Sequence, residues 1–192
     1  GTVIDVCGGP LPGRSVKAVF AGVANAVITA DQLDTPLTHE HMTAIGSGLG
    51  SAGFVVYDDS ACMVEVVTML SRFLSVESCG QCPPCKLGSG QITDALTRLR
   101  DGGGTEADID TIHRALRFVT DGNRCYLPVQ ERALVSSVLG AFPDDFAMHL
   151  AGRCGSDRTE FPTPKIVEIA DGSVTYDLAQ ARKRPDWTYA DE

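Results

Sequence analysis

The sequence predicts an α+β fold in three parts: a small module of strands with one helix, a helical bundle, and a polar tail with a β-hairpin. Residues 1–57 are rich in Gly and Val and hold short apolar runs between Pro and Gly turns, which is typical of strands. From Asp58 onward, apolar residues recur at the i, i+3, i+4, i+7 spacing of amphipathic helices. Near the end, Asp171-Gly172 separates two short apolar runs and predicts a hairpin.

Within the first part, strands are expected at 15–20 and 54–57, with a short helix at 39–44. The glycine-rich stretch 46–53 has the composition of a phosphate-binding loop. A dinucleotide-binding fingerprint follows a strand and opens a helix, whereas this stretch precedes a strand. We therefore interpret it as a turn or a close-packing element, with a phosphate site as the less favoured alternative.

Four helices are expected in the second part. The first starts near Met63 and runs directly into Cys79, and the second covers 86–100 and stops at the glycines 102–104. Thr105 opens the third with a capping box that uses Asp108 in place of the usual Glu. The fourth begins near Pro128, because proline is favoured in the first helical turn.

Residues 143–151 add a short fifth helix, and the whole predicts a four-helix bundle of about 90 residues with cysteines at helix ends. The tail is expected to be extended apart from its hairpin at 166–169 and 173–176. The predicted domains are 1–59 for the strand-rich module, 60–152 for the helical bundle and 153–192 for the tail.

Composition excludes several classes of function. The formal net charge of −9 argues against nucleic acid or anionic lipid as the main partner, because both reward clusters of Lys and Arg. The sequence has no run of about 18 apolar residues and no signal-peptide pattern, so neither a membrane span nor export is expected. An odd number of cysteines, seven, with three in one short run, favours reduced thiols around a metal and a cytoplasmic location.

The cysteine run is the strongest functional signal. Cys79, Cys82 and Cys85 form a C-x2-C-x2-C pattern, which suits three corners of an iron–sulfur cubane. The fourth ligand has to come from elsewhere, and Cys125 is the best candidate because it lies in a turn at the start of the fourth helix. A zinc site with four cysteines is the alternative, although such sites usually split their ligands into two C-x2-C pairs.

The other cysteines and the histidines carry no comparable signal. Cys62 is interpreted as a small buried residue of the first helix, and Cys7 and Cys154 as turn residues. The four histidines share no ligand spacing beyond the pair His39 and His41, and are interpreted as core or surface residues.

The stretch 77–88 also resembles a known signature. Its sequence, E-S-C-G-Q-C-P-P-C-K-L-G, resembles the pattern E-S-C-G-x-C-x-P-C-R-x-G of the flavoprotein subunit of NADH:quinone oxidoreductase, respiratory complex I. Only Lys86 departs from it, keeping the charge of Arg but not its two-pronged geometry. Cys125 stands where that family has its fourth ligand. The resemblance covers nearly the whole chain and includes related subunits of NAD-linked hydrogenases and formate dehydrogenases.

The resemblance implies a β-grasp module of the SLBB type at 1–59 and one [4Fe–4S] cluster in the helical domain. Gly80, Lys86, Gly88 and Ser89 are expected around this cluster, where backbone N–H groups and the Lys86 charge would favour its reduced form. The family's FMN- and NADH-binding domain has no counterpart in these 192 residues. FMN and NAD(H) are therefore expected on an absent domain or a partner, and the chain alone is expected to be inactive toward NADH.

The expected function is the relay of single electrons from a flavin to other iron–sulfur centres of an NAD(P)H-linked oxidoreductase. The chain is then the C-terminal part of a longer subunit or a short homologue. Expected partners are a flavin/NADH-binding domain or subunit, a thioredoxin-like [2Fe–2S] subunit and a larger multi-cluster subunit. Nucleic acid is not an expected partner. The expected complex is cytoplasmic and lies at the inner face of a membrane. The alternatives are a structural module that a [4Fe–4S] cluster or zinc only staples, and a small-ligand binder, for which no convergent polar pocket is evident.

Overall fold

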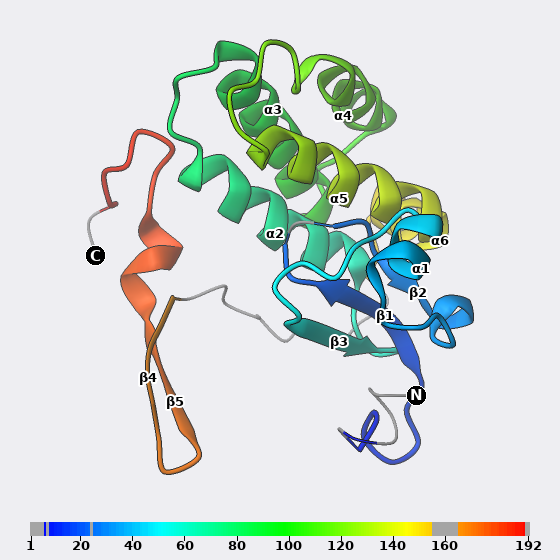
Figure 1. Ribbon diagram of the computed structural model, residues 1–192. Coiled ribbons are helices and arrows are strands. Elements are labelled where there is room, and N and C mark those ends of the chain that lie inside the picture. The colour runs from blue at the N-terminus through cyan, green and yellow to red at the C-terminus, as the bar shows by residue number, and fades with distance from the viewer. Residues whose placement is uncertain (1–5, 7, 24, 155–164, 191–192) are drawn as a thin grey trace.

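The computed structural model describes residues 6, 8–23, 25–154 and 165–190. A small antiparallel sheet lies against one side of a group of helices, and a hairpin projects away from both (Figure 1). The predicted mixture of helix and strand is therefore confirmed. Cys7 and residues 155–164 of the expected tail lie outside the described residues.

The sheet has β1 (Val16–Ala21) at its centre, between β2 (Ile28–Thr29) and β3 (Phe54–Asp58), and both pairings are antiparallel. The strands predicted at 15–20 and 54–57 are thus confirmed. The register of β1 against β3 shifts around Lys17, as in a β-bulge. From this irregular position the Lys17 ammonium donates to the Asp145 carboxylate and to the Ala61 carbonyl, both at 2.8 Å. The strand is thereby tied to the helices.

Two short helical segments connect the strands, η2 (Ala30–Gln32) and α1 (His39–Ala44). The side chain of Thr38 accepts a hydrogen bond from the backbone N–H of His41 and so caps α1 at the start that the sequence predicts. The glycine-rich stretch precedes β3, as expected. Gly50 has a φ of +55°, and a Cβ atom on it would lie 2.9 Å from the Ala21 carbonyl oxygen. The stretch thus packs closely against the end of β1, which agrees with the close-packing interpretation.

The helical part is organised around one helix, α2, which contacts three others, while α4 packs mainly on α3. No helix within the described ranges is both long and apolar enough to cross a membrane. The helices are α2 (Met63–Glu77), α3 (Pro83–Arg100), α4 (Glu106–Phe118), α5 (Leu127–Ala141) and α6 (Pro143–Leu150).

The helix ends follow the local sequence. The Thr105 N–H donates to Asp108 Oδ2 at 2.8 Å, which confirms the predicted capping box, and Arg98 donates to the other carboxylate oxygen at 2.8 Å. Pro128 lies in the first turn of α5, as expected. The second helix starts at Pro83 rather than at residue 86, because two consecutive prolines fit the first helical turn, where their missing N–H groups cost nothing.

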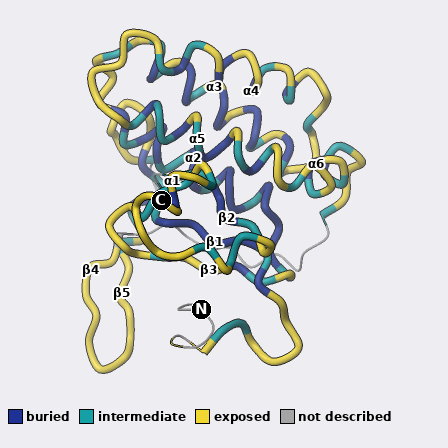
Figure 2. The backbone as a smooth tube through the Cα atoms, turned by 45° about the vertical axis from the view of Figure 1, so that its right-hand side comes forward, coloured by how far each residue is buried: buried dark blue, intermediate teal, exposed yellow. Residues whose placement is uncertain are grey.

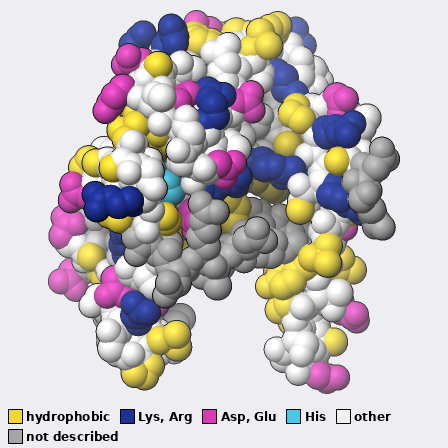
Figure 3. Space-filling model, turned by 180° about the vertical axis from the view of Figure 1, so that it is seen from behind, with side chains coloured by type: hydrophobic (Ala, Val, Ile, Leu, Met, Phe, Trp, Pro, Cys, Tyr) yellow, Lys and Arg dark blue, Asp and Glu magenta, His cyan; other side chains and the backbone are white. Residues whose placement is uncertain are grey.

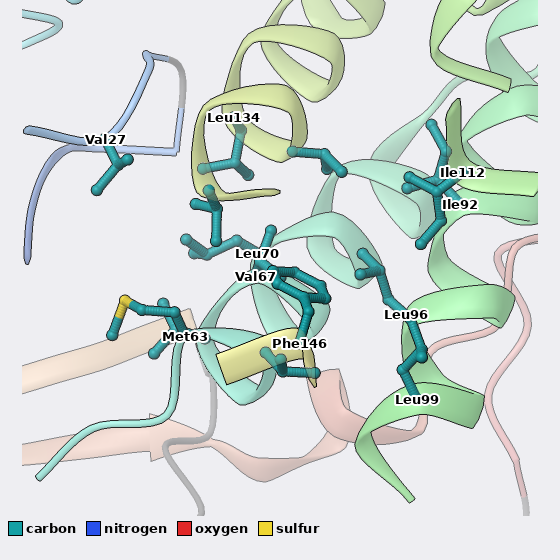
Figure 4. Close-up of a cluster of buried hydrophobic side chains, with 14 of the residues drawn as sticks. Val27, Met63, Val67, Leu70, Ile92, Leu96, Leu99, Ile112, Leu134 and Phe146 are labelled. Carbon is teal, nitrogen blue, oxygen red and sulfur yellow. The ribbon is translucent and has the colours of Figure 1, made fainter. Parts of the chain in front are cut away.

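One hydrophobic core runs from the sheet through α2 to the far helices. Phe20 and Tyr57 meet edge to face with ring centroids 5.7 Å apart, and both belong to the same buried cluster as Leu96 and Ile112. Figure 4 shows Met63, Val67, Leu70, Leu96 and Phe146 converging between the helices. The boundary predicted at 59/60 falls between β3 and α2, and the core crosses it. The division into separate domains stays a prediction.

The tail carries the predicted hairpin, with β4 (Lys165–Ala170) antiparallel to β5 (Ser173–Asp177). Asp171 and Gly172 have φ of 50° and 75°, and a two-residue turn with both φ values positive matches the right-handed twist of the strands. The hairpin is exposed along its length (Figure 2), and hydrophobic side chains gather on it (Figure 3).

Candidate metal centre

Three cysteines lie at the junction of α2 and α3. Ser78 ends α2, Gly80 turns the chain with a φ of +74°, and Cys82 is the residue that precedes the first turn of α3. Cys79 is exposed, Cys82 is half-buried and Cys85, in the first turn of α3, is buried. The start of a helix carries a partial positive charge, so this junction favours thiolates and other negative groups.

Cys125 approaches from the loop between α4 and α5. It is exposed, and its carbonyl accepts a hydrogen bond from the Asn123 side chain at 2.8 Å. The neighbouring Arg124 donates to Gln81 in the cysteine run at 3.4 Å, which joins the two loops. Burial raises the pKa of the Cys85 thiol, and the negative charges of the other three cysteines raise that pKa further, against a hydrogen bond with Ser78 that lowers it. All four predicted ligands therefore gather at one end of the helices.

Gly88 explains why the two loops can meet. A Cβ atom on this residue would lie 3.0 Å from a methyl of Val119 and 3.2 Å from its Cα, so any larger side chain would push α3 away from the end of α4. The close approach of α3 to this turn places the α4–α5 loop beside the cysteine run. Gly88 and Ser89 are both buried within α3, where the Ser89 hydroxyl donates to the Lys86 carbonyl at 3.4 Å.

Lys86 fixes the end of α2. Its ammonium donates to the carbonyls of Ser75 and Ser78 at 3.0 and 2.9 Å, at the helix end where the regular i to i+4 hydrogen bonds stop. Burial lowers the pKa of this ammonium, which the nearby thiolate of Cys85 counteracts. Lys86 thus places a positive charge next to the cysteine run and holds the loop in position.

The end of the tail also contacts this loop. After η3 (Leu178–Arg182), the Lys183 ammonium lies 2.8 Å from Glu77 Oε1 and 5.2 Å from the centre of the Trp187 ring. The indole N–H of Trp187 donates to the Ser78 carbonyl at 3.1 Å. Arg72 on α2 donates to the carbonyls of Ala181 and Lys183 at 2.7 and 2.8 Å. The basic segment 182–184 is packed against α2 through Lys183.

No three of the sulfurs of Cys79, Cys82, Cys85 and Cys125 all lie within 4.8 Å of one another in the described structure. Four thiolates bound to one zinc ion at 2.3 Å lie about 3.8 Å apart. Among the described residues, three potential ligand atoms come within 4.8 Å of one another only at Cys62, His149 and Cys154.

Two features of the helical core are not predicted by the sequence. Cys62, His149 and Cys154 form the second group just described, whose only sequence signal is the short spacing between His149 and Cys154. The other feature is Glu131 on α5, which is fully buried and accepts a hydrogen bond from Ser71 at 2.6 Å, while its second carboxylate oxygen has no partner among the described residues. Burial raises the pKa of Glu131 to about 8, so its carboxyl is protonated at neutral pH.

Comparison with known proteins identifies the region that carries the cysteines. Residues 65–149 match the family model described as NADH-ubiquinone oxidoreductase-F iron-sulfur binding region. The F 2 subunit of NADH-quinone oxidoreductase in Rhizobium meliloti is 37% identical over 152 residues, which are 79% of this chain and 36% of that protein. NADP-reducing hydrogenase subunit HndC of Solidesulfovibrio fructosivorans is 31% identical over 77% of this chain and 30% of its own length. The chain thus spans about a third of the length of these relatives.

Solved structures agree with the fold. A chain of an NAD+-reducing [NiFe]-hydrogenase in the H2-reduced state superposes with a TM-score of 0.63 at 24% identity, covering 77% of this chain and 24% of that one. The air-oxidised form of such an enzyme gives a TM-score of 0.62 at 23% identity over 76% of this chain and 25% of that one. At this identity the likeness supports the arrangement of helices and strands.

Proposed function

From the premise that this chain belongs to the NADH-ubiquinone oxidoreductase-F iron–sulfur family, we propose that it relays single electrons within an NAD(P)H-linked oxidoreductase. The observation that carries the proposal is the convergence of Cys79, Cys82, Cys85 and Cys125 on one end of the helices, within the matched region 65–149. These four residues are the proposed ligands of one [4Fe–4S] cluster. The cluster, when bound, takes up and releases one electron at a time.

The chain's own residues hold the site and set its charge. The prolines of α3 remove two backbone N–H groups from its first turn, so Cys85 carries the first backbone N–H within that helix. Lys86 adds a positive charge, and Gly80 allows the tight turn between the first two ligands. Gly88 and Ser89 act from within α3, by allowing close packing and by filling a buried position. Positive charge and N–H groups near a cluster favour its reduced form.

FMN and NAD(H) would bind to another domain or subunit, so the chain by itself would be inactive toward NADH. The proposed partners are a flavin/NADH-binding domain or subunit, a thioredoxin-like [2Fe–2S] subunit and a larger multi-cluster subunit. The projecting hairpin, with Ile166, Val167 and Ile169 exposed, supports such an assembly because an apolar two-stranded edge is poorly suited to water. The assignments of a β-grasp module at 1–59 and a four-helix bundle at 60–152 belong to this proposal as well.

The second candidate is a structural role, in which the metal only staples the helices. One observation favours it: Lys183 and Trp187 of the tail clasp the cysteine loop, as expected for an element whose purpose is stability. The exposure of Cys79 and Cys125 favours the electron relay, because an electron donor or acceptor must come close to the cluster.

The test is an anaerobic assay of iron and acid-labile sulfide in the full chain, followed by EPR after reduction with dithionite. The expected result is about four iron and four sulfide per chain, visible absorption that dithionite bleaches, and a spin-½ signal from the reduced cluster. Zinc without inorganic sulfide on the four cysteines would eliminate the relay and leave the structural role.

A further inference from the structure

Three side chains at the opposite end of α2 form a compact group of metal-binding atoms. Cys62 immediately precedes α2, His149 lies in the last turn of α6, and Cys154 follows α6. The sulfurs and a ring nitrogen of the three all lie within 4.8 Å of one another. Because α2 has 15 residues, this group lies about 22 Å from the proposed cluster end, too far to share its ligands.

The histidine of this group is oriented as metal-binding histidines are. Its Nδ1 lies 3.0 Å from the carbonyl oxygen of Leu99, which can only accept, so Nδ1 carries the proton. In the neutral ring the lone pair is then on Nε2, which faces Cys62 Sγ at 3.1 Å. Histidine ligands usually donate their second N–H to a backbone carbonyl in this way, which fixes the tautomer and the plane of the ring.

We propose that Cys62, His149 and Cys154 bind a zinc ion. This site is independent of the proposed electron relay and goes beyond it. Zinc binds thiolates at about 2.3 Å and imidazole at about 2.0–2.1 Å, so a sulfur and a nitrogen in its tetrahedral shell lie about 3.6 Å apart. The observed 3.1 Å between Cys62 and His149 has to open only slightly. The fourth position belongs to water or to a ligand that the described residues do not supply.

The chemistry of the group suits zinc better than the other common ions. Two thiolates and an imidazole are soft and borderline ligands, whereas magnesium and calcium require oxygen atoms. Burial raises the pKa of Cys62, so without metal it is a thiol that can donate to His149. On binding, two Zn–S bonds and one Zn–N bond form, and Cys62 and Cys154 each lose a proton to solvent. The two thiolates balance the charge of Zn2+.

The ion would join the start of α2 to the end of α6 and to the residues just after it. Cys62 and Met63 begin α2, and the Met63 N–H donates to Asp145 of α6 at 2.7 Å, so the two helices are already adjacent there. His149 connects the same point to the end of α3 through Leu99. Cys154 follows α6, so the ion would also fix the chain just beyond that helix.

The experiment uses the full chain, loaded with iron–sulfur cluster and purified anaerobically from medium that contains zinc. Metal analysis is expected to find about one zinc per chain in addition to iron. X-ray absorption at the zinc edge is expected to show two sulfur neighbours at about 2.3 Å and nitrogen or oxygen at about 2.0–2.1 Å. Zinc misplaced on the cysteine run would show sulfur alone, and that result would overturn the proposal.

Cys154→Ser is the decisive variant, because Cys154 is only half-buried and the fold tolerates its loss best. Zinc affinity, measured by competition with a chelator, is expected to fall by more than the 10- to 100-fold that changes around a zinc ligand cost. The iron content stays as in the wild type and reports that the chain is folded. His113→Ala, at an exposed position on α4, is the control and keeps its zinc.

Three outcomes would contradict the site: a wild-type chain without zinc, a Cys154→Ser chain that retains its zinc affinity, and a disulfide between Cys62 and Cys154 after anaerobic purification. The last would show that the group is a redox pair. A chain without zinc would leave Cys62 as a simple hydrogen-bond donor to His149. None of these results would affect the iron and sulfide assay of the cluster, so the two proposals succeed or fail separately.

Discussion

The two ends of α2 present cysteines in opposite ways. At the α3 end, four cysteines lie in two loops and in the first turn of α3, and they range from exposed Cys79 to buried Cys85. At the other end, Cys62 and His149 are almost fully buried among helices. A large group needs loops that can wrap around it and an open side for electron exchange, whereas a single ion fits between helix ends. A site of the first kind can therefore be found from cysteines that are closely spaced in the sequence. A site of the second kind forms only when the helices pack together.

The largest effect is expected when cysteines at the two ends are exchanged for alanine one at a time. Cys85→Ala removes a proposed cluster ligand and is expected to lose nearly all of the roughly four iron and four sulfide per chain. Cys62→Ala, which removes a thiol of similar burial at the other end, is expected to keep them. Iron and sulfide assays with EPR measure both. Equal iron loss in the two variants, with helical circular dichroism intact, would refute the separation of the ends.

Glu131 lies in the core between the two ends of α2. Its burial predicts that the free energy of unfolding depends on pH, independently of either group of cysteines. Its carboxyl has a pKa of about 8 in the fold, against 4.5 for the ordinary group. Between these values the folded chain holds one more proton than the unfolded chain, so the free energy of unfolding falls as the pH rises through this window. The total loss is on the order of 5 kcal/mol and is complete above pH 8.

The glutamine side chain in Glu131→Gln has the shape of the protonated acid but cannot ionise. This variant is expected to lose most of the dependence of the free energy of unfolding on pH. Urea denaturation at pH 6 and pH 8.5 measures the difference. Glu106→Gln, at an exposed position in the first turn of α4, is the matched control and keeps the wild-type dependence. If the two variants respond to pH alike, the Glu131 carboxyl is ionised in the folded protein at pH 6 as well as at pH 8.5.

The tail is a second difference between the two ends of α2. Among the described residues, those of the tail contact the cysteine-bearing loop only at the α3 end, through Lys183 and Trp187. Lys183→Met removes the ion pair with Glu77 and the contact with the Trp187 ring. It is expected to lower the free energy needed to detach the tail segment 178–190 from α2 by about 2 kcal/mol. Trp187 is the chain's single tryptophan, so its fluorescence should shift to the red. Hydrogen exchange at 178–190 gives a second measure. Arg184→Met, exposed in the same basic segment, should leave both unchanged.

The smallest effect concerns the charge beside the proposed cluster. Lys86→Met removes the ammonium next to the cysteine run and is expected to make the cluster potential more negative by on the order of 50 mV. Redox titration followed by EPR measures the shift. Lys86→Arg restores the charge and should restore most of the potential. A potential that Lys86→Met leaves unmoved would mean that Lys86 serves only to hold the end of α2.

Most elements of the fold could be predicted because their signals are local. The Thr105 capping box, the Asp171-Gly172 turn and the apolar period of α2 each depend on residues within a few positions, and the structure has all three. The predicted start of α3 is three residues late, since the prolines at 83 and 84 suit a loop as readily as a first helical turn. The pairing of β1 with both of its neighbours depends on contacts that no local pattern contains.

The cysteine run could be found from the sequence alone, because its three thiols lie at short fixed spacings within seven consecutive residues. Only the tertiary structure brought Cys125 beside that run, since its approach depends on Gly88 letting α3 and the turn after α4 come close. The same holds for the pair Lys183 and Glu77, which are 106 residues apart in the sequence. It holds as well for the group of Cys62, His149 and Cys154, in which Cys62 and His149 are 87 residues apart. Such groups are chosen by how helices pack, and packing depends on the whole core at once.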